Sequence, residues 1–113
     1  MCGFAGIASL KSNKINYLNK YLKVLGELIS HRGPDGEGIW ISEKENAGLS
    51  HRRLAIIDLS EAASQPMIAQ NGTSIAFNGE IYNYPEIRQS LSAYWDFQSH
   101  SDTECILAAY EKY

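Results

Sequence analysis

Met67–Phe77 reads Met-Ile-Ala-Gln-Asn-Gly-Thr-Ser-Ile-Ala-Phe, two short apolar runs separated by a polar stretch around Asn71-Gly72. Asn-Gly between apolar runs is the strongest short-range signal for a β-hairpin, because both central residues of a type I′ turn need positive φ. We therefore predict paired strands at Met67–Ala69 and Ser74–Phe77. A tight hairpin makes that pairing antiparallel, which favours an α+β fold over a parallel sheet.

The chain before the hairpin holds further regular elements. Short apolar runs predict strands at Phe4–Leu10, Gly38–Ser42 and Leu49–Leu59. A helix is expected over Asn16–Ile29, where an apolar stripe recurs at helical spacing and consists of Ile15, Leu18, Leu22, Leu25 and Leu28 or Ile29. The segment His31–Gly36 contains two glycines and a proline and is expected to be a loop.

Two helices are expected after the hairpin. One begins at Asn83, with Pro85 in its first turn and Glu86 three residues after the cap. The other begins at Ser101–Glu104, which fits a capping box, and continues to Tyr113 without a glycine. A domain rarely stops inside a helix, so we expect residues 1–113 to be the N-terminal part of something longer.

Composition limits the classes of protein that the chain can represent. Its 113 residues suit one domain, and 44% apolar content argues against disorder. A net charge of −3 gives no basic surface for nucleic acid or an anionic membrane.

No apolar run approaches the roughly 20 residues of a membrane helix, and the N-terminus lacks a signal peptide, so a cytoplasmic location is expected. Because the cytoplasm is a reducing compartment, Cys2 and Cys105 are expected to be thiols.

Cys2 is the first candidate for chemistry. An aminopeptidase can remove Met1 when the next residue is small, which would place Cys2 at the N-terminus. A terminal cysteine carries a nucleophilic thiol and an amine that can take its proton, directly or through one water. The alternative is a small apolar residue with no catalytic role.

Four other residues could bind an amide substrate or stabilise its reaction. The Asn78 side chain and the Gly79 N–H can donate to the oxyanion that forms when an amide is attacked. Arg53 can grip a carboxylate with two parallel hydrogen bonds, and Asp102, at a helix N-terminus, can accept from an ammonium group. The alternatives are an ordinary Asn-Gly-Glu turn, a surface salt bridge for Arg53 and a capping role for Asp102.

Metal and phosphate sites are not indicated. The potential ligands lack the Cys-x-x-Cys spacing of structural zinc, and we expect His31 and His51 to hold backbone geometry instead. The Gly33–Gly36 segment lacks the Lys-Ser/Thr ending of a phosphate loop. The potential ligands are Cys2, His31, His51, His100 and Cys105.

Five segments in register carry a family resemblance. They are Met1–Gly3, Ser30–Gly36, Leu49–Asp58, Phe77–Asn83 and Ser101–Glu104. Together they resemble the glutaminase domain of class II glutamine amidotransferases, in the branch of the glutamine-hydrolysing asparagine synthetases. His-Arg-Gly-Pro-Asp favours that branch over the sugar-phosphate amidotransferases, and the resemblance covers essentially the whole chain.

The resemblance implies an N-terminal nucleophile hydrolase fold, an αββα sandwich of antiparallel sheets, here truncated. Cys2 would be the nucleophile, and Asn78 and Gly79 would form the oxyanion hole. The residues that would bind glutamine are Arg53, Leu54, Ala55, Ile56, Ile57, Asn78, Gly79, Glu80 and Asp102.

The resemblance also implies what lies outside the segment. Residues 1–113 would be the N-terminal part of the glutaminase domain, and an absent synthetase domain would bind ATP, magnesium and aspartate. No cofactor or metal is expected in the segment itself, and a homodimer is one expectation for the parent protein. Two alternatives stay open. The ammonia acceptor could differ, for example a sugar in polysaccharide synthesis, or the chain could be an inactive remnant used as an interaction module.

Overall fold

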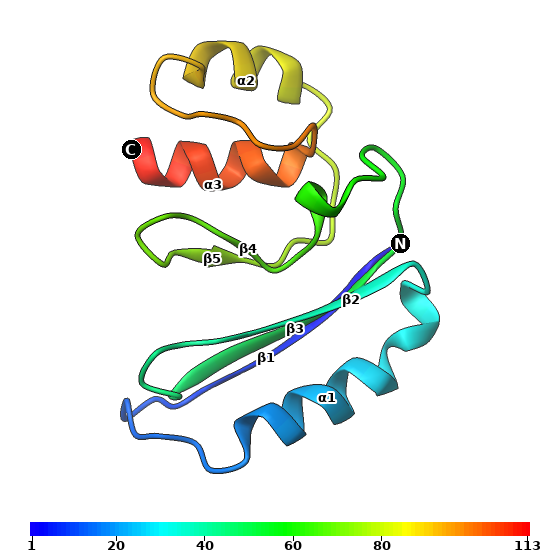
Figure 1. Ribbon diagram of the computed structural model, residues 1–113, viewed down its shortest axis with the longest axis vertical. Coiled ribbons are helices and arrows are strands. Elements are labelled where there is room, and N and C mark those ends of the chain that lie inside the picture. Colours follow the sequence, from blue (N-terminus) through cyan, green and yellow to red (C-terminus); the bar gives the residue numbers. More distant parts are fainter.

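The computed structural model describes residues 1–113 and contains ten short elements (Figure 1). In chain order they are β1 (Gly3–Ala8), α1 (Leu18–Leu28), η1 (Ser30–Arg32), β2 (Gly36–Ile41), β3 (Ala47–Arg53), η2 (Glu61–Ala63), β4 (Met67–Ile68), β5 (Ser74–Ile75), α2 (Tyr84–Leu91) and α3 (Asp102–Lys112).

All strand pairing is antiparallel. The larger sheet has the order β1-β3-β2, with Gly3 opposite Arg52 and Gly36 opposite Arg53. β4 and β5 form a separate two-stranded sheet. The α+β class with antiparallel sheets is therefore confirmed.

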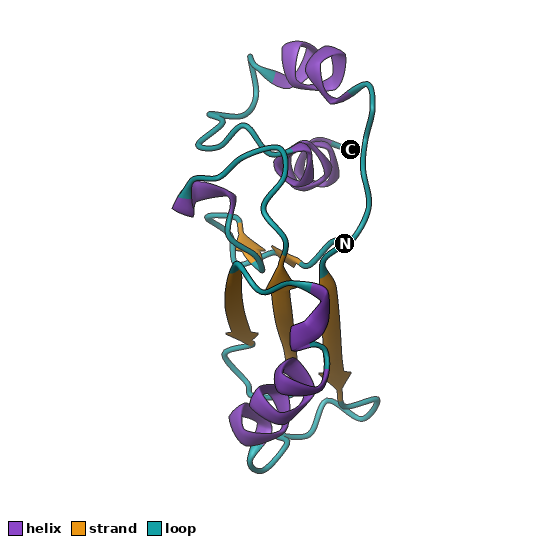
Figure 2. Ribbon diagram, turned by 90° about the vertical axis from the view of Figure 1, so that its right-hand side faces the viewer, coloured by secondary structure: helices purple, strands orange, loops and turns teal.

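The elements are stacked in layers (Figures 1 and 2). α1 covers one face of the larger sheet, where its Leu18 and Leu22 are buried. The β4–β5 hairpin lies on the opposite side of that sheet, followed by α3 and then α2. A small apolar core joins the hairpin to α3 and consists of Ala63, Met67, Ala69 and Leu107, with Ile75 and Trp95 packed against it.

The hairpin is confirmed, but its predicted turn is wrong. Ala69 N–H donates to Thr73 O, and Gly72 N–H donates to Ala69 O, so three residues form the loop instead of two. Only Gly72 has positive φ, at 91°, whereas a type I′ turn would also need it at Asn71. The Asn71 side chain instead accepts from Thr73 N–H and donates to Glu111 of α3, so a distant helix helps to select the turn.

The predicted strand over Phe4–Leu10 corresponds to β1 but ends at Ala8, and two other predicted strands are also too long. β3 ends at Arg53, so the predicted strand over Leu49–Leu59 is wrong beyond that residue. β5 ends at Ile75, although a strand was predicted over Ser74–Phe77. In both places an apolar run leaves the sheet to line a cavity, and periodicity alone does not separate these two uses.

The region around α1 also differs in detail. The helix is shorter than the predicted Asn16–Ile29, and Leu28, expected on the buried stripe, is 68% exposed. The predicted loop over His31–Gly36 is partly wrong, because Ser30–Arg32 forms a 3-10 turn and Gly36 already belongs to β2.

Both C-terminal helices are confirmed, although their caps differ from the prediction. Asn83 is the N-cap of α2, but its side chain makes no capping hydrogen bond. Ser101 caps α3 by accepting from Thr103 N–H at 3.2 Å. Glu104 does not complete a capping box, because its carboxylate accepts from Ser99, Gln98 and Trp95 instead. No helix combines the length and apolar composition needed to cross a bilayer.

Candidate active site

One cavity of about 390 Å³ contains every residue that the sequence singled out for chemistry. It opens between the larger sheet, the loop that follows β3 and the first turn of α3. Those residues are Cys2, Arg53, Leu54, Ala55, Ile56, Ile57, Asn78, Gly79, Glu80 and Asp102.

Cys2 lies immediately before β1 and is fixed to the loop after β3. Its Sγ accepts from Leu54 N–H at 3.2 Å and lies 3.5 Å from Leu54 O, close enough for the thiol to donate. Arg32 Nε donates to Cys2 O at 3.1 Å. Because Leu54 holds the thiol from the loop and Arg32 holds the backbone from η1, the position of the sulfur in the cavity is well defined.

The Asn78-Gly79 turn lines the same cavity and contains two amide donors. Neither the Asn78 side-chain amide nor the Gly79 N–H donates a hydrogen bond within the protein. The Phe77 ring packs closely against the turn, and a Cβ built on Gly79 would lie 2.5 Å from it. A side chain at this position would therefore have to displace the Phe77 ring or the turn, and glycine avoids that.

Arg53 is the last residue of β3 and binds the loop that follows it. Nη1 donates to Ser60 O at 2.9 Å, and Nη2 donates to Asp58 O. Arg53 forms no salt bridge, so the surface ion pair considered as its alternative role is wrong. A guanidinium has five N–H donors, which leaves others able to meet a carboxylate in the cavity.

Asp58 connects the loop after β3 to the segment before α3 through hydrogen bonds. Its carboxylate accepts from Ser60 N–H at 2.8 Å and from His100 N–H at 2.7 Å. Hydrogen bonds from the Ser60 side chain and backbone, and then from the His100 backbone, lower the pKa of Asp58 to about 2.

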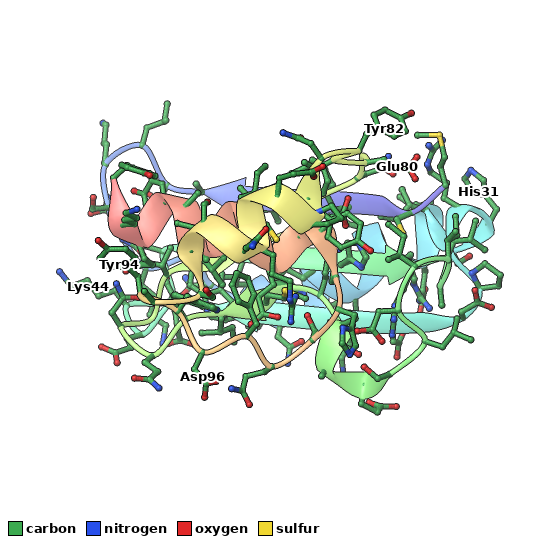
Figure 3. The ribbon with its side chains drawn as sticks, turned by 90° about the horizontal axis from the view of Figure 1, so that it is seen from above. His31, Lys44, Glu80, Tyr82, Tyr94 and Asp96 are labelled. Atoms are coloured by element: carbon green, nitrogen blue, oxygen red, sulfur yellow. The ribbon has the colours of Figure 1, made fainter.

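Asp102, the first residue of α3, is only 5% exposed. Its carboxylate accepts from Ile81 N–H at 2.9 Å, just beyond the Asn78–Glu80 segment. The capping role considered for Asp102 is wrong, because Ser101 caps the helix. Glu80 is exposed and, with Tyr82, lies toward the same end of the molecule as His31, away from Lys44 and Tyr94 (Figure 3).

His51 lies beneath the site, on β3, and is fully buried. Burial is the main cause that lowers its pKa below the ordinary 6.5, and the charge of Arg53 acts in the same direction. The Phe77 backbone nearby acts in the opposite direction and raises the pKa. Neither ring nitrogen, however, makes a hydrogen bond of good geometry. The imidazole is therefore held mainly in its neutral form.

Gln65 and Asp58 also line the cavity but were not found from the sequence. Gln65 binds Thr103, 38 residues away, and Asp58 binds His100, 42 residues away. No local spacing marks such long-range pairs. No three His, Cys, Asp or Glu side chains come together in a way that could hold a metal ion.

A thiol in a cavity that is also lined by two amide groups without a partner in the protein suits a cysteine enzyme that cleaves amides. In agreement with that class, the chain belongs to the glutamine amidotransferase domain family, whose model matches residues 1–113.

Known proteins match the chain over most or all of its length. Asparagine synthetase B [glutamine-hydrolyzing] of Escherichia coli is 41% identical over 99% of this chain and 20% of its own length. Asparagine synthetase [glutamine-hydrolyzing] 1 of Bacillus subtilis is 40% identical over 100% of this chain and 18% of its own length. Amidase chry2 of Gibberella zeae is 42% identical over 77% of this chain and 13% of its own length. The chain thus spans about a fifth or less of the length of these relatives.

Proposed function

We propose that this domain hydrolyses glutamine to glutamate and ammonia, with Cys2 as the nucleophile. The observation that carries the proposal is the shared cavity, which brings Cys2 together with Asn78, Gly79, Arg53 and Asp102 from four separate parts of the chain.

The reaction needs Met1 to be removed, so that the α-amine of Cys2 can take the thiol proton. The sulfur then bonds to the side-chain carbonyl carbon of glutamine, and the carbonyl electrons move to the oxygen. The Asn78 amide and the Gly79 N–H stabilise this oxyanion. When the C–N bond breaks, the amine returns the proton and ammonia leaves. Water then cleaves the thioester to release glutamate and restore the thiol.

Substrate orientation comes from the other charged residues of the cavity. The N–H groups of Arg53 that do not bind the loop hold the α-carboxylate of glutamine. Asp102 and Glu80 accept from the α-ammonium group, and the backbone of Leu54–Ile57 forms the adjacent wall. The Asp102 carboxylate has two oxygens, and its bond to Ile81 uses only one of them.

The fold forms part of the same proposal. We assign the chain to the N-terminal nucleophile hydrolases, whose helix–sheet–sheet–helix sandwich has the layer order that α1, the larger sheet, the hairpin and α3 follow in Figure 1. A cytoplasmic location suits the chemistry, because a reducing compartment keeps a reactive thiol free.

In the whole protein we propose that the ammonia serves asparagine synthesis. The asparagine synthetases of Escherichia coli and Bacillus subtilis described above support this acceptor. Aspartate, ATP and magnesium would then bind in a synthetase domain, and no step involving them is assigned to residues 1–113. The relative named as an amidase supports a different fate for the ammonia or the acyl group as the second candidate.

The test compares two cysteine variants in the protein that carries this domain. Cys2→Ala should abolish glutamate formation from glutamine while leaving any reaction driven by added ammonia. Cys105→Ala is the matched control and should keep the glutaminase rate, because that thiol is buried against Tyr84 O. A Cys2→Ala protein that still hydrolyses glutamine at the parent rate would refute the proposal.

A further inference from the structure

The turn that carries Asn78 and Gly79 is held at both ends by side chains. On the N-terminal side, Phe77 N–H donates to Gln65 Oε1 at 2.6 Å. On the C-terminal side, Ile81 N–H donates to Asp102 at 2.9 Å. The two donors of the turn therefore lie between two fixed backbone groups.

Gln65 is itself fixed by two other parts of the fold. Its Nε2 donates to Thr103 Oγ1 at 3.2 Å, and Thr103 is only 1% exposed in the first turn of α3. The backbone carbonyl of Gln65 packs on β2, where a Cβ built on Gly38 would lie 2.0 Å from Gln65 O. Gln65 thus connects the larger sheet and α3 to the strand end that precedes the turn.

We propose that Gln65 is a positioning residue, which places the Asn78 amide and the Gly79 N–H through its hydrogen bond to Phe77. The inference rests on the proposed function, since it concerns the oxyanion donors of that reaction. An amide suits this position because it accepts from one neighbour and donates to another without adding charge near a developing oxyanion.

The expected kinetic effect falls on kcat. The two donors act on the oxyanion, so their displacement weakens an interaction that the transition state makes and the bound substrate does not. Gln65→Met keeps the length of the side chain but removes both hydrogen bonds. A resulting shift of about 1 Å in the donors should lower kcat roughly a hundredfold, with KM for glutamine changed by less than about twofold.

A second pair of variants guards against loss of the fold. Thr103→Val removes the anchor of Gln65 but leaves Gln65 in place, and it should lower kcat by a smaller factor. Thr103→Ser keeps the hydroxyl and should restore the parent rate. If Gln65→Met melts at a much lower temperature than the parent, the comparison of Thr103→Val with Thr103→Ser tests the positioning role of Gln65 instead. Equal rates for Thr103→Val and Thr103→Ser would overturn the role.

Gln89→Met, on the exposed surface of α2, is the matched control, and Cys2→Ala is measured in parallel. Loss of activity in Cys2→Ala and a fall in kcat at constant KM in Gln65→Met support the inference. Loss in Cys2→Ala with unchanged kcat in Gln65→Met, or with an equal effect from Gln89→Met, overturns the positioning role alone. Retained activity in Cys2→Ala overturns the proposed function and the positioning role with it.

Discussion

Replacing Gly79 by alanine perturbs the proposed oxyanion hole without removing its donor, because alanine keeps the backbone N–H. The added Cβ would lie 2.5, 2.9 and 3.3 Å from three atoms of the Phe77 ring. Carbon atoms rest about 3.5 Å apart or more, so the ring or the turn must move by about 1 Å. We expect the turn to move, which displaces the Gly79 N–H, and such a displacement of the proposed oxyanion donor should lower kcat for glutamine hydrolysis by about a hundredfold.

Gly36→Ala is the matched control, because its Cβ would lie 3.7 Å from the nearest atom, the Arg53 Cβ, which is ordinary contact. Steady-state rates of glutamate formation and thermal unfolding should be measured for both variants. Overpacking costs about 1–3 kcal/mol of stability, so a folded Gly79→Ala protein is expected. A folded Gly79→Ala protein with the parent kcat would show that the turn does not need its close contact with Phe77.

Three further predictions test other parts of the structure. Arg53→Lys should raise KM for glutamine, since a charged hydrogen bond contributes about 1.5–3 kcal/mol, roughly ten- to hundredfold; an unchanged KM would contradict carboxylate binding. Because burial lowers the pKa of His51 below 6.5, the unfolded state takes up the proton first as the pH falls, and the free energy of unfolding should decrease below about pH 6.5. Urea denaturation between pH 7 and 5 measures this slope, up to about 1.4 kcal/mol per pH unit, and an equal slope in His51→Gln would exclude His51 as its source. Leu22→Ala should cost about 2–5 kcal/mol in the same assay, whereas Leu28→Ala should cost far less; similar losses would contradict the orientation of α1.

The fold could be predicted where the signal is local. Asn71-Gly72 located the hairpin, and the apolar stripe that includes Leu18 and Leu22 located α1. The exact turn could not be predicted, because the Asn71 side chain also binds Glu111 of α3. The loop after β3 was predicted as a strand because its apolar run looks like one, yet Ile56 is 72% exposed at the cavity.

The candidate site also contains some residues that the sequence could identify and others that it could not. Cys2, Asn78 and Gly79 stand out because position in the chain and residue type suggest their chemistry directly. Gln65 and Asp58 do not stand out, because their importance depends on hydrogen bonds to residues about 40 positions away. Local sequence therefore identified the candidate residues that line the cavity, whereas the residues that hold them in place became visible only in the folded chain.

The central proposal, that Cys2 is the nucleophile, is tested by identifying which residue forms the covalent bond. The protein that carries this domain should be treated with a glutamine-mimicking electrophile and examined by intact-mass spectrometry and peptide mapping. If Cys2 is the nucleophile, the spectra should show loss of Met1 and a single adduct on Cys2, with glutaminase activity lost in proportion to labelling. Inactivation that coincides with an adduct on Cys105, with Cys2 unmodified, would contradict it.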